Sequence, residues 1–226
     1  MNGFFGYGSW NQPTWFIGME EGGCAALDEF NRRVDAWVQR GCKELEDARS
    51  YHAAIGVNQW FTKGARMQST WEKLIRIYLA LHEQCTDKES VRRFQIEDFG
   101  NQESGFPVVE LFPVPSVNAR SWIYSSIELP YLTSREVYQS VVGPRRSQAL
   151  RERIQRYRPR HVICYGSTYR SRWESLIGQP LKRTPLNDVF ETRIETALFM
   201  VVPHPISHGR TQAYWTEIGK YLRDSA

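Results

Sequence analysis

Four short apolar runs constrain the fold of this chain more than any other feature of its sequence. They are 14-TWFIGM-19, 107-PVVELFP-113, 161-HVICYG-166 and 197-ALFMVVP-203. Each run is nearly continuous in apolar residues instead of alternating with polar ones, which is typical of strands covered on both faces. Helical patterns separate the runs. The sequence therefore predicts a doubly wound α/β fold around a parallel sheet.

The helices are predicted from apolar side chains at helical spacing and from capping signals. Ser69 and Glu72 form a candidate capping box, and Thr86 offers a second one with Glu89. Residues 188–202 fit a hairpin that leads into the fourth strand. We expect the whole chain, residues 1–226, to form one domain. The predicted helices cover residues 25–40, 70–84, 145–157 and about 211–222, with others before Gly100 and after Gly166.

Composition narrows the class of protein. A hydrophobic content of 41% supports a sizeable core. No apolar stretch reaches the roughly 18 residues of a membrane span, and the start MNGFFGYGSWNQP does not resemble a signal peptide. The four cysteines are too widely spaced for a zinc or iron–sulfur ligand pair. We therefore expect a cytoplasmic protein with no membrane segment, no metal cluster and no cofactor.

Charge is unevenly distributed along the chain. The segment from Pro144 to Arg183 contains 11 Lys/Arg and 2 Asp/Glu, a balance of +9, although the whole chain carries only +4. A basic segment on a slightly acidic body suits a polyanion such as nucleic acid. The alternative is an ordinary solvated helix face.

The loop after the first predicted strand, 18-GMEEGG-23, joins a Gly-rich turn to two acids. It is not a nucleotide-binding fingerprint, because it lacks G-x-G-x-x-G and a terminal Lys-Ser/Thr pair. Glu20 follows a buried strand, where a partly desolvated carboxylate can act as a base or stabilise a cation. Glu21 is a possible second acid. The alternative is a glycine turn with solvated acids.

The loop after the last predicted strand, 203-PHPISHGR-210, is the second candidate for chemistry. His204 lies between two prolines, which restrict the backbone that carries the imidazole. Backbone N–H groups at the start of the next helix could hold a phosphate. The alternative is a histidine without a catalytic role, with Ser207 as a helix cap. The residues expected at the phosphate are Ser207, His208 and Arg210.

Two further segments carry candidate binding residues. Glu110 lies inside an apolar strand and needs a partner or a function, and Phe112 could belong to the core or stack on a planar ligand. In 60-WFTKGARMQS-69, Trp60 accompanies Lys63 and Arg66, and aromatic residues among basic ones suit flipped or single-stranded nucleotides. The alternative is an ordinary surface loop.

Taken together, the first and last loops resemble those of the uracil-DNA glycosylase superfamily. In that family a Gly-x-(Asp/Asn)-Pro-Gly-like turn follows the first strand, and a His-Pro-Ser-like loop follows the last. Here the corresponding segments are 18-GMEEGG-23 and 204-HPIS-207. The order of strands and the final helix also agree, so the resemblance spans nearly the whole chain. It implies a three-layer α/β/α fold with a central four-stranded parallel sheet.

The resemblance also implies a reaction. A nucleotide is flipped out of DNA into a pocket, and its N-glycosidic bond is hydrolysed through an oxocarbenium-like cation to leave an abasic site. Glu20 matches the acid that positions water and stabilises the cation, and His204 matches the group that stabilises the leaving base. Residues 206–210 match the segment that presses into DNA. The implied base pocket is Gly18, Met19, Glu110, Phe112 and Trp60, and the implied DNA contacts are Gly22, Lys63, Arg66, Ser207, His208 and Arg210.

Departures from the family pattern shape the expected substrate. Glu20 is one methylene longer than the family's Asp, Glu21 replaces the Pro, and Glu110 stands where a base-reading Asn is expected. A carboxylate accepts hydrogen bonds and would favour an amino group such as cytosine N4. The expected function is a monomeric bacterial DNA glycosylase, nucleoid-associated when acting, for a damaged or modified base, for instance a modified cytosine in phage DNA. The alternatives are an inactive DNA-binding module and an N-glycosidase for free nucleosides or nucleotides.

Overall fold

A single mixed sheet runs through the molecule, as seen in a computed structural model that describes residues 1–118 and 120–225. The eight strands follow the order β3-β1-β4-β2-β5-β8-β7-β6. The strands are β1 Gly6–Tyr7, β2 Thr14–Gly22, β3 Leu45–Glu46, β4 Val108–Ser116, β5 His161–Tyr165, β6 Lys182–Arg183, β7 Phe190–Ile194 and β8 Ala197–Val202.

The four apolar runs of the sequence are β4, β2, β5 and β8, which pair in parallel in that order. The α/β class is therefore confirmed, but the sheet is larger and more varied than four parallel strands. β1 pairs antiparallel with β4, and β7 pairs antiparallel with β8, as the hairpin pattern predicts. The short strands β3 and β6 lie at the two edges.

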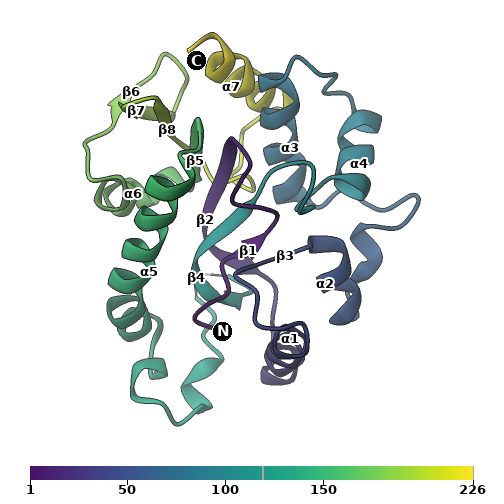
Figure 1. Cartoon of the computed structure of the whole chain (residues 1–226), viewed down its shortest axis with the longest axis vertical. Coiled ribbons are helices and arrows are strands. Elements are labelled where there is room, and N and C mark those ends of the chain that lie inside the picture. The colour runs from purple at the N-terminus through teal and green to yellow at the C-terminus, as the bar shows by residue number, and fades with distance from the viewer. Residues whose placement is uncertain (119, 226) are drawn as a thin grey trace.

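Helices cover both faces of the sheet, with α5 and α6 on one side and α3, α4 and α7 on the other (Figure 1). This arrangement follows from the continuous apolar strands, because both faces of such strands must be buried. The α-helices are α1 Leu27–Gln39, α2 Ala48–Ala54, α3 Ser69–Leu81, α4 Lys88–Glu97, α5 Arg135–Tyr157, α6 Arg170–Ile177 and α7 Gln212–Asp224; the 3₁₀ turns are η1 Asn58–Trp60, η2 Tyr124–Ser126, η3 Pro130–Leu132 and η4 Ser167–Tyr169.

Both predicted capping boxes are replaced by caps one residue away. The side chain of Gln68, not Ser69, accepts the backbone N–H of Trp71 at 2.7 Å at the start of α3. Asp87, not Thr86, caps α4 by accepting the N–H of Ser90 at 2.7 Å. The cap is the side chain that reaches a free backbone N–H of the first turn, and the capping-box pattern alone does not identify it.

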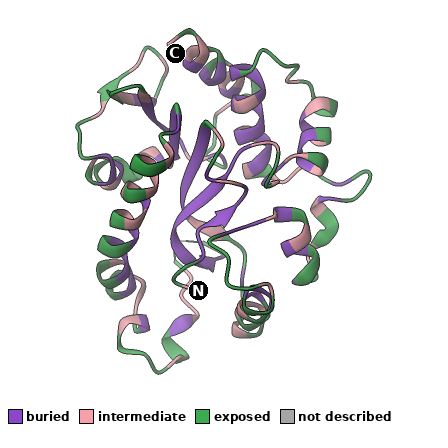
Figure 2. Cartoon of the chain, viewed as in Figure 1, coloured by how far each residue is buried: buried purple, intermediate pink, exposed green. Residues whose placement is uncertain are grey.

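Two apolar cores lie on the two faces of the sheet. Trp215 is fully buried in the core under α3 and α7, and Trp15 and Trp173 are fully buried in the core under α5 and α6. Figure 2 shows the central strands buried and the outer helix surfaces exposed. In the part of the chain that the structure describes, no helix has the length and apolar character needed to cross a bilayer.

Candidate functional site

The carboxyl ends of the parallel strands carry the candidate site. Glu20 and Glu21 precede Gly22, the last residue of β2. Glu110 is paired with Gly18 in the register of β4 against β2, β5 ends with Tyr165, and the chain leaves β8 at Pro203 and His204. Because these strands are parallel neighbours, their last residues lie along one edge of the sheet. The prediction of a Gly-rich turn at residues 18–23 is wrong, because β2 continues through Gly22; this segment and the loop after β8 are nevertheless brought to the same edge.

Glu20 is held by Arg135, the first residue of α5. One terminal nitrogen of Arg135 contacts both carboxylate oxygens of Glu20, and its other donates to Ser116 Oγ at 2.7 Å. Burial raises the pKa of Glu20, whereas the charge of Arg135 acts in the opposite direction. The acid is therefore partly buried, paired and fixed in position.

Glu21 turns to different partners, although it is the next residue. Its Oε1 accepts the hydroxyl of Tyr7 at 2.8 Å, and its Oε2 accepts an N–H of Arg33 on α1 at 2.9 Å. His52 on α2 places Nε2 3.9 Å from the same Oε1. The register of β2 against β4 shifts between Glu20 and Gly22. Glu21 is therefore not a solvated neighbour of Glu20 but the centre of its own polar cluster.

Glu110 and Tyr165 meet across β2. The hydroxyl of Tyr165 donates to Glu110 Oε1 at 2.6 Å, although β4 and β5 are separated by β2 in the sheet. The contact passes over Gly18, where a Cβ atom would lie 2.1 Å from the Tyr165 oxygen and 2.3 Å from Glu110 Oε2. Glycine is required at this position because any side chain would occupy the space that the pair fills.

Burial raises the pKa of Glu110 to about 8, and the nearby charges of Glu21 and Glu20 act in the same direction. Glu110 is therefore mostly a neutral acid near pH 7. Its Oε2 is buried and has no hydrogen-bond partner among the described residues. A neutral acid donates as well as accepts, so the expectation that Glu110 selects an exocyclic amino group loses its basis.

His204 is half-buried, and its ring packs edge-on against Tyr165 with 5.9 Å between centroids. Its Nδ1 accepts the backbone N–H of Ile206 at 3.3 Å. An accepting Nδ1 carries no proton, so the neutral ring carries its proton on Nε2. Burial lowers the pKa of His204, which favours this neutral form. The side chain is thus prepared to donate one hydrogen bond.

Most of the rest of the last loop is exposed, although Pro205 is buried and Arg210 is half-buried. Ile206 is 59% exposed, and Ser207 and His208 are also at the surface. Arg210 forms an ion pair with Asp188 and lies over the Tyr214 ring, so it is already engaged within the protein. Thr211 rather than Ser207 caps α7.

The predicted stacking residues are not equivalent. Phe112 has no exposed surface and packs against Tyr138 in the core beside α5, so the structure places it in the core and not at an open pocket. Trp60 is partly exposed and stands edge-on to Trp71 at 6.3 Å. Met19 is buried in the same core as Phe112, whereas Gly22, Lys63 and Arg66 are exposed.

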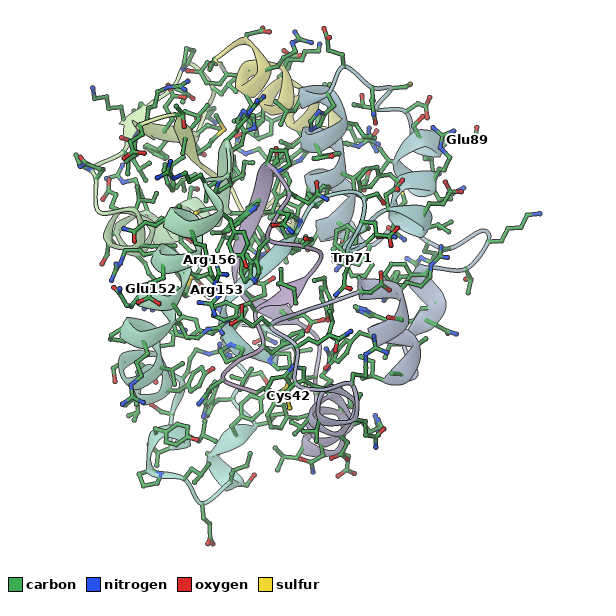
Figure 3. The ribbon with its side chains drawn as sticks, viewed as in Figure 1. Cys42, Trp71, Glu89, Glu152, Arg153 and Arg156 are labelled. Carbon is green, nitrogen blue, oxygen red and sulfur yellow. The ribbon has the colours of Figure 1, made fainter. Side chains whose placement is uncertain are left out.

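The basic segment does not form one face around the site. The last turns of α5 lead into His161, the first residue of β5, so they lie at the amino ends of the strands, away from the acids. Arg146 is buried and donates to the backbone oxygens of Glu110 and Leu111. Arg153 pairs with Glu44. Figure 3 places Arg153 and Arg156 on the α5 side and Trp71 on the other.

Sequence reasoning missed several side chains of this edge. His52, Arg33 and Tyr7 join Glu21 although they are distant in sequence, and none belongs to a recognisable motif. Tyr165 could have been noticed as the polar-tipped residue that ends an apolar strand. Comparison with known proteins found no matching family model and no matching curated protein.

Proposed function

We propose that the protein is a DNA glycosylase that hydrolyses the N-glycosidic bond of a flipped, damaged or modified base and leaves an abasic site. Glu20 stabilises the positive charge that develops on the sugar, and His204 donates its Nε2–H to the departing base. Ile206 enters the space that the flipped nucleotide leaves. The parallel pairing of β4, β2, β5 and β8 supports the proposal, because the resemblance to the uracil-DNA glycosylase superfamily implies a central parallel sheet.

The observation that carries the proposal is that Glu20 and His204, which suit opposite charges, lie at the same edge of the sheet. Hydrolysis of an N-glycosidic bond develops positive charge on the sugar and negative charge on the base. The carboxylate of Glu20, fixed near the end of β2, suits the positive charge on the sugar. The neutral imidazole of His204, with its proton on Nε2, suits the negative charge on the base. Ile206 is exposed beside the surface residues Ser207 and His208, which supports insertion into a duplex.

A second candidate is an N-glycosidase for free nucleosides or nucleotides. The basic segment is the main argument for a polymer substrate, but the last turns of α5 lie at the amino ends of the strands, and Arg146 and Arg153 are engaged within the protein. The arginines therefore do not form an extended basic surface at the site, and a small substrate needs no such surface. Salt dependence separates the candidates, because binding to DNA releases counterions and weakens steeply with salt.

The experiment is a substrate panel. The protein is incubated with duplex and single-stranded DNA containing uracil, hypoxanthine or modified cytosines, and with free nucleosides. Abasic sites are detected by alkaline cleavage, and released bases by chromatography. We expect abasic product from at least one DNA, and a loss of at least about 100-fold in kcat for Glu20→Gln and for His204→Ala.

The matched control is His82→Ala. His82 is an exposed histidine at the end of α3, and its charge acts on His161 at the amino ends of the strands. The His82→Ala variant should release base at the wild-type rate. Release of bases only from free nucleosides would favour the second candidate. Binding of DNA without any release of base would leave only the binding module.

A further inference from the structure

His52 is held with its Nε2 near the carboxylate of Glu21. Its Nδ1 lies 2.7 Å from the backbone oxygen of Ala48, which can only accept, so Nδ1 carries the ring proton. Burial lowers the pKa of His52 and favours the neutral ring. In that form Nε2 has no proton and is a hydrogen-bond acceptor.

Two acceptors therefore face each other in this cluster. Nε2 of His52 and Oε1 of Glu21 are 3.9 Å apart, too far for a direct hydrogen bond and without a proton between them. A water that donates one hydrogen to each satisfies both. With hydrogen bonds of ordinary length, the two acceptors would subtend roughly 90° at its oxygen, which leaves the oxygen lone pairs directed away from both.

The surroundings fix this arrangement. The imidazole of His52 lies against the rings of Tyr7, Phe61 and Trp71, with centroids 5.1, 5.4 and 5.5 Å away. Tyr7 donates to one oxygen of the Glu21 carboxylate and Arg33 donates to the other. Neither acceptor can turn away without losing a hydrogen bond or moving packed aromatic rings.

The cluster also lies beside the predicted base site. Glu21 lies three residues beyond Gly18 on β2, Glu110 and Tyr165 meet at Gly18, and Tyr165 packs against His204. Glu20, in contrast, is engaged by Arg135 at the start of α5. The two adjacent acids are therefore available for different tasks.

We propose that Glu21 and His52 together hold the water that attacks the sugar carbon, with His52 Nε2 as the base that accepts its proton. This assignment rests on the proposed function. The new bond forms between the water oxygen and the anomeric carbon while the bond from that carbon to the base nitrogen breaks. The bonding electron pair leaves with the base, beside His204. The proton on His52 returns to solvent, and the base takes up one proton from solvent.

The test uses His52→Asn, Glu21→Gln and the control His161→Asn. Asparagine retains a donor for the Ala48 carbonyl but lacks Nε2. His161 is also a buried histidine with a hydrogen-bonded Nδ1, but it lies at the amino ends of the strands beside Thr14. Thermal unfolding checks that each variant folds. If His52→Asn does not fold, Glu21→Gln decides the question alone.

Two quantities are measured with the DNA on which the wild type is active. The first is the kcat and KM for base release. The second is the ratio of methyl glycoside to hydrolysed sugar in water–methanol mixtures, which reports how the attacking molecule is held. We expect kcat to fall at least about 100-fold for His52→Asn with KM little changed. Both His52→Asn and Glu21→Gln should raise the share of methyl glycoside, and His161→Asn should change neither quantity.

The outcomes separate the two claims. An active wild type whose folded His52→Asn and Glu21→Gln variants keep their rates within about twofold, with an unchanged product ratio, overturns this assignment and leaves the glycosylase standing. A lowered rate with an unchanged product ratio also overturns it, because that pattern indicates a structural role. A wild type that releases no base overturns the proposed function and this assignment with it.

Discussion

Replacing Glu110 with glutamine should stabilise the protein at alkaline pH and not at acid pH. Burial raises the pKa of Glu110 from an ordinary value of 4.5 to about 8. Each pKa unit corresponds to about 1.4 kcal/mol, so ionising Glu110 in the folded protein costs up to about 5 kcal/mol relative to the unfolded chain. Glutamine has nearly the shape of the neutral acid, can still accept the Tyr165 hydroxyl, and cannot ionise.

The sign follows from proton binding. Below pH 4.5, Glu110 is protonated in both states and contributes no penalty. Between pH 4.5 and about 8 the folded state binds more protons than the unfolded state, so the wild-type free energy of unfolding falls as the pH rises. The advantage of Glu110→Gln should therefore grow from near zero at pH 4.5 to as much as about 5 kcal/mol above pH 8.

Urea unfolding followed by tryptophan fluorescence at pH 4.5, 7 and 8.5 measures this difference. The matched control is Glu46→Gln, since Glu46 is also fully buried but pairs with Arg40 at 2.9 Å. Its loss should destabilise the protein at pH 7 and at pH 8.5 alike. The reasoning about Glu110 is refuted if the difference between wild type and Glu110→Gln is the same at all three pH values.

Three further predictions concern other sites. Gly18→Ala should lower the free energy of unfolding by about 1–3 kcal/mol, because its Cβ would clash with the Glu110–Tyr165 pair, whereas Gly22→Ala, with open space around it, should change it little in the same urea assay. Asp87→Ala should lower the free energy of unfolding through loss of the α4 cap, and Ser69→Ala should leave it almost unchanged. Because burial lowers the pKa of His204, its contribution to kcat/KM should persist as the pH falls below 6.5; a decline centred above pH 6.5 that His204→Ala abolishes would contradict this.

The parts of the fold that depend on local pattern could be predicted from the sequence. Continuous apolar runs located the four parallel strands, and helical spacing located α1, α3 and α7. The two-residue strands β1 and β3 could not be predicted, because two residues show no periodicity. The first half of α5 was missed as well, since Pro144 lies inside it and Val137 and Val141 are exposed on it.

The residues of the candidate site also fall into those that the sequence predicts and those that it does not. Glu20 and His204 were suggested by the loops that follow strands, because parallel topology places such loops together. The partners of these residues depend on contacts between distant segments: Arg135 with Glu20, and His52 with Glu21. No local pattern encodes which of two adjacent acids turns to which helix. The same limit applies to Glu110, because its neutral state depends on its burial and on the nearby charges of Glu21 and Glu20, which outweigh the opposing hydrogen bond from Tyr165.

The absence of a side chain at Gly18 has a consequence for local unfolding of the sheet. Glu110 on β4 and Tyr165 on β5 touch over this glycine, so two strands that share no backbone hydrogen bonds are linked above the strand that separates them. Separation of β4 or β5 from β2 must break this link and expose a buried carboxyl group. The amide protons of β4 and β5 near this point should therefore exchange with solvent through one common opening, and the three strands should behave as one cooperative unit of the folded protein.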